Sequence, residues 1–263
     1  MTTTIATRST RLSFGTEEAT FVARSLLHSI RNYDALTMAI VLPVMIMLMF
    51  TFIFGRAIDP SGDYVTYVVP GIILLCAGFG ASSTAVDVAN DMQSGIIDRF
   101  RTMQIRSWAV LTGHVVASLV RNLVATGIVI GVAVAVGFRP DATPIEWIGA
   151  IGLIALYILA ITYLFAAIGL AASSAEAANG YGFILLFVPY ISSAFVPLET
   201  LPVGLRWVAE NQPLTPIIET IRGLTTGTPL DTQPLWALGW CALILAIAVF
   251  WGAAMFRRKA GRR

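Results

Sequence analysis

Six long apolar runs constrain the fold of this chain more than any other feature. They cover roughly Ala35–Phe54, Tyr64–Val86, Val110–Phe138, Trp147–Ala171, Gly180–Val196 and Leu235–Phe256. About twenty apolar residues in a helix cross a hydrocarbon core of about 30 Å, so each run approaches or exceeds the length of a membrane span. Only 12% of the residues are charged, whereas soluble domains carry about 25%. We therefore predict an all-α integral membrane protein with six transmembrane helices.

Basic residues outside the apolar runs predict the orientation of the chain. If the N-terminus is cytoplasmic, the inner segments hold twelve Lys and Arg residues and the outer segments hold four. Since Lys and Arg collect on the cytoplasmic side, this orientation is favoured, and six spans then place both termini in the cytoplasm. We expect one domain over 1–263, with a cytosolic tail and interfacial helix in 1–34, the six-span bundle in 35–256 and a basic cytosolic tail in 257–263.

Residues 16–31 predict an amphipathic helix ahead of the first span. Thr16 is a suitable N-cap, and Glu17 and Glu18 suit the positive end of the helix dipole. The apolar residues of this stretch share one face: Ala19, Val22, Leu26, Leu27 and Ile30. Such a helix is expected to lie in the inner headgroup layer; the alternative is an ordinary cytosolic helix.

A charged stretch follows the second apolar run and reads DMQSGIIDRFRTMQIRSW from Asp91 to Trp108. Its two Asp and three Arg residues are excluded from hydrocarbon, so the chain is expected to return to water here. Its apolar residues recur at spacings of three and four, namely Met92, Ile96, Ile97, Phe100 and Met103. This spacing predicts a short amphipathic helix on the membrane surface, which is suited to docking a soluble partner.

The segment Pro197–Pro234 is rich in Pro and Gly and contains two short helical patterns, Leu201–Glu210 and Thr215–Leu224. In the second pattern, Thr215 is a predicted cap and Pro216 occupies the predicted first helical position. Its apolar face consists of Ile217, Ile218, Ile221 and Leu224. We expect both helices at the outer membrane surface, with partial re-entry allowed only where protein covers the backbone.

These two regions resemble matching parts of ABC-2 type permeases. The string DMQSGIIDRFRTMQIRSWAVLTGHVVASLVRNL resembles the loop between spans two and three, and FVPLETLPVGLRWVAENQPLTPIIETIRGL is similar to the external segment between spans five and six. The likeness is to daunorubicin-resistance permeases and their lipid-exporting relatives, and it covers nearly the whole chain. It implies paired permeases on two ATP-binding subunits in the bacterial plasma (inner) membrane, exporting a hydrophobic or amphipathic drug or lipid.

The resemblance also implies roles for particular residues. A cytosolic coupling helix between spans two and three would sit in a cleft of the ATPase, and its ATPase-coupling positions are Asp91, Gly95, Asp98, Arg99, Phe100, Arg101, Ile105 and Arg106. Gln104 stands where the family usually has proline, which leaves the end of that helix open. Two short external helices would gate the outer exit through Pro197, Glu199, Glu210, Pro213, Pro216, Glu219 and Arg222.

The chain lacks the residues of a phosphate-binding P-loop. That motif needs Lys followed by Ser or Thr, and the single lysine, Lys259, is followed by Ala260. We therefore expect no enzymatic activity and no cofactor on this chain, and the resemblance implies that ATP and Mg are bound by a partner ATPase. The expected partners are two P-loop ATPase subunits, a second permease copy or a homologous permease, and membrane lipids. The net charge of only +2 implies no large basic surface for nucleic acid.

Some polar and aromatic residues within the apolar runs allow two interpretations. Arg121 could snorkel to the inner interface or form a pathway or ion pair, with Asp87 as a reasonable partner. His28 and His114 show no metal-ligand spacing, so no metal site is expected. The candidates for lining a substrate path are Phe79, Phe183, Phe187 and Tyr190. Packing against lipid is the alternative for these aromatic residues.

Two other classes of function are weighed against an ATP-driven exporter. A self-sufficient secondary transporter or channel would need ionisable groups deep in the bundle, and the apolar runs hold essentially none near mid-membrane. A membrane-embedded enzyme would need a catalytic cluster. Ser82 and Ser83 invite comparison with an intramembrane protease, but close helix packing by small residues explains them better.

Overall fold

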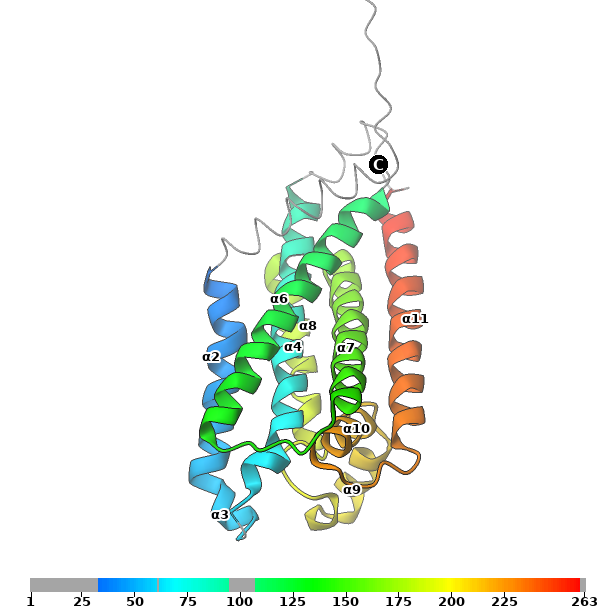
Figure 1. Ribbon diagram of the computed structural model, residues 1–263. Coiled ribbons are helices and arrows are strands. Elements are labelled where there is room, and N and C mark those ends of the chain that lie inside the picture. Colours follow the sequence, from blue (N-terminus) through cyan, green and yellow to red (C-terminus); the bar gives the residue numbers. More distant parts are fainter. Residues whose placement is uncertain (1–32, 61, 95–106, 261–263) are drawn as a thin grey trace, which may run out of the picture.

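The fold is a bundle of long helices that run side by side (Figure 1). The structure is a computed structural model that describes residues 33–60, 62–94 and 107–260. Within these ranges the chain forms helices and no β-strand, which confirms the predicted all-α class. The long helices are α2 (Tyr33–Met49), α4 (Tyr64–Gln93), α6 (Ser107–Val136), α7 (Pro144–Ala171) and α11 (Gln233–Ala260). The short ones are η1 (Phe50–Phe54), α3 (Gly55–Ile58), α8 (Ala175–Leu185), η2 (Val188–Ile191), η3 (Leu198–Thr200), α9 (Val203–Asn211) and α10 (Leu214–Thr226).

Five helical segments among the described residues are long and apolar enough to cross a membrane. They are Ala39–Ile58, Tyr64–Gln93, Gly113–Val136, Pro144–Ala171 and Gln233–Met255, and they match the first, second, third, fourth and sixth predicted spans. The chain is therefore a multi-pass membrane protein. We call the end of the bundle where α11 ends and α6 begins the C-terminal end (Figure 1). The opposite end carries α9 and α10, and we call it the α9–α10 end.

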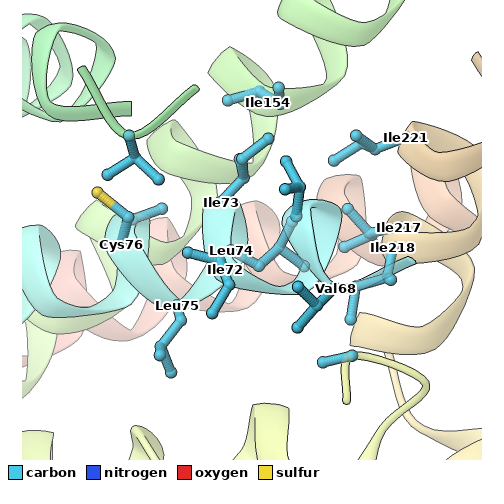
Figure 2. Packing of buried hydrophobic residues seen from close by; sticks show 14 of the residues in the cluster. Val68, Ile72, Ile73, Leu74, Leu75, Cys76, Ile154, Ile217, Ile218 and Ile221 are labelled. Carbon is cyan, nitrogen blue, oxygen red and sulfur yellow. The ribbon is translucent and has the colours of Figure 1, made fainter. Parts of the chain in front are cut away.

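Helix α4 is the centre of the bundle. In the most apolar stretch of α4, 83% of the residues are buried inside the bundle, whereas the corresponding share for α11 is 17%. The largest core cluster surrounds the first half of α4 and includes Ile154 from α7 (Figure 2). Helix α10 contributes Ile217, Ile218 and Ile221, all fully buried against α4. The predicted apolar face of α10 therefore packs into the core of the bundle at the α9–α10 end.

The predicted fifth span over Gly180–Val196 is not one continuous helix. Helix α8 ends at Leu185, and the chain continues into the 3-10 helix η2. The physical reason is Pro189, whose nitrogen has no hydrogen to continue the α-helical bonding pattern. We call residues 182–195 the broken pass.

The broken pass nevertheless follows α4 in the antiparallel direction. Its residues lie against α4 in reverse order, 182 beside 82, 186 beside 78, 194 beside 71 and 195 beside 64. An α-helix rises about 27 Å over the eighteen steps from residue 64 to residue 82. The broken pass therefore covers nearly the depth of a hydrocarbon core of about 30 Å.

The structure corrects the predicted end of the second span and the predicted start of the coupling helix. Helix α4 continues to Gln93, so Asp91 belongs to its last turn and does not begin a separate coupling helix. The rest of that predicted helix, 95–106, lies outside the described residues, as does the predicted interfacial helix over 16–31.

The two short helices predicted within Pro197–Pro234 are present as α9 and α10, with a correction at the start of α10. Thr215 is not the cap, because α10 begins at Leu214 and the Thr215 hydroxyl donates to the carbonyl oxygen of Ala209 at 2.6 Å. Pro216 is the third helical residue, not the first. A proline is tolerated there because the first turn of a helix has no internal acceptors for its N–H groups. At its other end α10 stops at Gly227, whose positive φ of 71° suits a glycine C-terminal cap.

Candidate functional site

Three polar side chains hold the backbone of the broken pass at the α9–α10 end. The hydrogen bonds run from Tyr64 Oη to Phe195 O at 2.6 Å, from Gln212 Nε2 to Ile191 O at 2.5 Å, and from Arg222 Nη2 to Ser193 O at 2.7 Å. Non-helical backbone at membrane depth is tolerated only where its polar groups are satisfied inside the protein or by water. These side chains come from α4, from the residue after α9 and from α10, so three elements fix one irregular strip of chain.

Arg222 is the most highly connected of the three side chains. Its Nε and Nη2 also donate to the carbonyl oxygen of Tyr67, at 3.2 and 2.9 Å, and its Nη1 lies 2.5 Å from Glu219 Oε1. Its guanidinium carbon lies 3.8 Å from the centroid of the Tyr67 ring, which adds a cation–π contact. Only 8% of Arg222 is exposed, so this buried charge depends on these partners.

The structure places the predicted gate residues in three different settings. Glu219 and Arg222 form the ion pair just described. Glu210 forms an ion pair with Arg206 at 2.7 Å, and both side chains are more than 40% exposed. The remaining four lie at turns and at the start of α10: Pro197 and Glu199 at η3, and Pro213 and Pro216 at α10. The Arg206–Glu210 pair on α9 is thus on the surface, whereas the Glu219–Arg222 pair on α10 is largely buried at the α9–α10 end.

Aromatic rings form a continuous series along the broken pass and η1, which we call the aromatic ladder. Its successive ring centroids lie 5.2 Å apart for Phe183–Phe187, 6.1 Å for Phe187–Tyr190, 5.0 Å for Tyr190–Phe195, 4.5 Å for Phe195–Phe50 and 5.5 Å for Phe50–Phe54. Phe187 is 54% exposed, whereas Phe195 is 3% exposed. The ladder therefore joins an open aromatic surface to a buried anchor. Phe79, the fourth predicted path residue, instead packs against the central core.

At the C-terminal end, Asp91 is the one predicted coupling residue that the structure describes. Its Oδ2 lies 2.9 Å from Nε2 of His114 on α6. Two residues further on, the Gln93 carboxamide donates to the carbonyl oxygen of Ser173, in the connection between α7 and α8, at 3.3 Å. The end of α4 is therefore tied to two other parts of the bundle. The other seven coupling residues (Gly95, Asp98, Arg99, Phe100, Arg101, Ile105 and Arg106) lie outside the described residues.

Arg121 does not snorkel to an interface, so that interpretation is wrong. It is 7% exposed, and its Nη2 donates to Gly80 O at 3.0 Å and to Ser83 Oγ at 2.6 Å on α4. The Asp87 carboxylate adds a favourable electrostatic interaction with Arg121. Ser83 is thus a hydrogen-bond partner of an arginine, and the imidazole of His114 is bonded to Asp91.

Sequence reasoning missed Tyr64, Tyr67 and Gln212 at the α9–α10 end, and Phe50 and Phe54 in the aromatic ladder. Tyr64 and Phe195 are 131 residues apart, and Arg222 and Tyr67 are 155 apart, so no local pattern could pair them. Phe50 and Phe54 did carry a usable signal, because residues four apart share one face of a helix.

Comparisons with known proteins agree on one family. A family model described as ABC-2 type transporter matches residues 17–225. The "Daunorubicin resistance ABC transporter permease protein DrrB1" of Streptomyces coeruleorubidus is 28% identical over 215 residues, which is 80% of this chain and 75% of that protein. The "Probable doxorubicin resistance ABC transporter permease protein DrrC" of Mycobacterium tuberculosis is 26% identical over 249 residues, covering 90% of each chain.

Proposed function

Because the chain belongs to the ABC-2 type transporter family, we propose that it is the membrane permease of a bacterial exporter driven by ATP that separate subunits hydrolyse. Membership in this family over most of the chain is the observation that carries the proposal. The sequence adds that the chain has a single lysine, outside any P-loop pattern. The exporter therefore needs two P-loop ATPase subunits, which bind the ATP and Mg, and a second permease copy or a homologous permease.

The ATPases act on this chain through the stretch from Asp91 to Arg106. A charged amphipathic segment at the end of α4 supports this role, because it offers a soluble partner both apolar and basic contacts. The excess of Lys and Arg in segments of this side supports a cytoplasmic location for it and for both termini. Closure of the ATPases moves this segment, and α4 carries the movement to the α9–α10 end.

The exit lies at the α9–α10 end, where Arg222 holds the broken pass against α4 and α10. Because this strip is fixed by side-chain hydrogen bonds and not by helical backbone bonds, it can be released without unfolding a span. The Pro197–Pro216 region and the Glu219–Arg222 pair then act as the outer gate.

The substrate is a hydrophobic or amphipathic molecule, a drug or a lipid. Two relatives carry daunorubicin or doxorubicin resistance in their names, and the aromatic ladder offers this chain a surface for flat or apolar groups. Phe183, Phe187 and Tyr190 line the path that such a molecule follows.

Combining Phe100→Ala with Arg101→Glu tests the coupling role. We expect ATP-dependent efflux in vesicles to fall about tenfold, which corresponds to about 1.4 kcal/mol of lost interaction with the ATPase. Copurification of the ATPase should weaken in parallel. Arg56→Glu is the matched control, since it makes the same charge change at the α9–α10 end and should leave efflux unchanged. Full efflux and full copurification in the double variant would show that the coupling segment is wrongly assigned.

Phe187→Ala tests the aromatic path. Removing this ring interrupts the ladder, and we expect the apparent KM for a planar aromatic substrate to rise about threefold to tenfold, since aromatic pairs contribute about 0.5–1.5 kcal/mol. Ile184→Ala is the control, because Ile184 is 66% exposed in the same broken pass but has no ring. Equal effects of the two substitutions on KM, measured in the same vesicles, would indicate a lipid-facing surface.

A further inference from the structure

Helices α4 and α6 are joined by polar contacts at three successive levels. The contacts pair Asp91 with His114 at 2.9 Å, Thr84 Oγ1 with Ser118 Oγ at 2.8 Å, and Arg121 with Ser83 Oγ at 2.6 Å and with Gly80 O at 3.0 Å. Residue numbers fall on α4 as they rise on α6, as expected of an antiparallel pair. From 80 to 91 an α-helix rises about 16 Å, so the contacts cover roughly half of a hydrocarbon core.

Two of the levels, Thr84–Ser118 and the Arg121 contacts, lie in the interior of the bundle and hold the helices close together; we call them the inner levels. Thr84, Ser118 and Arg121 are each less than 8% exposed. At Gly80 the helices come so close that an added Cβ would collide with the Asn122 carboxamide. Hydrogen bonds of this kind stabilise helix pairs in membranes. The inner levels therefore fix the register of α4 on α6 and belong to the fold itself.

The third level, the Asp91–His114 contact, is different, because it lies at the C-terminal end of the bundle and is partly exposed. The side chains of His114 and Asp91 are 18% and 23% exposed. Asp91 lies in the last turn of α4 and is the first residue of the proposed coupling segment, whereas His114 lies about two turns into α6. If this bond is broken, the ends of the two helices can separate while the inner contacts still hold.

We infer that His114 is a positioning residue for energy coupling. Its bond to Asp91 joins the ends of α4 and α6 at the proposed coupling segment, so that a displacement of the segment moves both helices together. Without the bond, part of the displacement is absorbed by separation of the two helix ends, and ATP is hydrolysed with less transport. This inference depends on the coupling role proposed above for the stretch from Asp91 to Arg106.

The test compares His114→Ala, Asp91→Ala and the double variant in vesicles that contain the full transporter with its ATPase. We expect the amount of substrate transported per ATP hydrolysed to fall about fivefold, which is at the low end of the range usual for coupling between two sites. The melting temperature and ATPase copurification should stay unchanged. Because the two residues form one contact, the double variant should be no worse than either single one. The exchanged pair, His114→Asp with Asp91→His, should restore coupling. Arg139→Ala is the control, since its guanidinium donates to the carbonyl oxygens of Val134 and Phe138 at the opposite end of α6, away from the coupling segment.

Three results would overturn the inference. Unchanged transport per ATP in His114→Ala would show that the bond carries no displacement. Additive losses in the double variant would show that the residues act separately. A fall in melting temperature that matches the loss of transport, without rescue by the exchanged pair, would assign His114 a purely structural role. In each case a continued loss of efflux in the Phe100→Ala, Arg101→Glu variant would leave the proposed function standing.

Discussion

Replacing Arg222 with alanine is expected to abolish nearly all transport by the folded protein. The substitution removes the donor to the carbonyl oxygens of Tyr67 and Ser193 and the partner of Glu219. A buried polar group left without its partner costs about 1–3 kcal/mol, and here the carbonyl oxygens of both Tyr67 and Ser193 lose their donor. We therefore expect the melting temperature to fall and efflux per molecule of folded protein to drop more than about tenfold.

Two further substitutions make the Arg222 prediction specific. Arg222→Lys should recover only part of the activity, because an ammonium group lacks the planar fork that reaches several acceptors at once. Arg206→Ala is the matched control, since Arg206 forms an exposed ion pair on α9 and such pairs contribute little. If Arg222→Ala and Arg206→Ala behaved alike in both efflux and melting, the α9–α10 end would not depend on Arg222.

Replacing Gly71 with leucine is expected to displace the broken pass and prevent assembly of a stable bundle. A Cβ built on Gly71 lies 2.5 Å from Ala194 Cβ and 2.7 Å from Ala194 Cα. Because the obstacle includes backbone, rotation of a neighbouring side chain cannot relieve it. Overpacking a core costs about 1–3 kcal/mol and occasionally more, and we expect this substitution to reach the upper end.

The measurement for Gly71→Leu is the yield of monodisperse protein in detergent, together with its melting temperature. Gly127→Leu is the control, because Gly127 lies on α6 with nothing within 4 Å of an added Cβ. Gly71→Ala should be intermediate between wild type and leucine. Normal yield and melting of Gly71→Leu would mean that the broken pass does not pack on α4 as described.

Apolar length and helical spacing were sufficient to predict much of this fold. Five of the predicted spans are continuous helices, since about twenty apolar residues leave few alternatives to a spanning helix. The face of α10 was also predictable, because Ile217, Ile218 and Ile221 follow helical spacing and are all buried. These features depend on local pattern, which a single sequence contains.

The break after α8 and the site that holds it were not predictable in the same way. Gly180–Val196 is as apolar as a span, and proline is tolerated in many membrane helices, so the presence of Pro189 did not by itself predict a break. What stabilises the irregular chain is a set of donors on α4 and α10, and their pairing depends on the tertiary fold. Arg121 was misjudged for the same reason, because its acceptors lie 37 to 41 residues earlier in the chain.

The most direct test of the account is to purify the tagged chain from its native membrane and assay what copurifies. The account predicts a P-loop ATPase in stoichiometric amount, and vesicles containing both that move substrate only when ATP is supplied. Vesicles of the chain alone should show no flux. A pure oligomer without ATPase that moves solute down a gradient would contradict the account and identify the chain as a channel or secondary transporter.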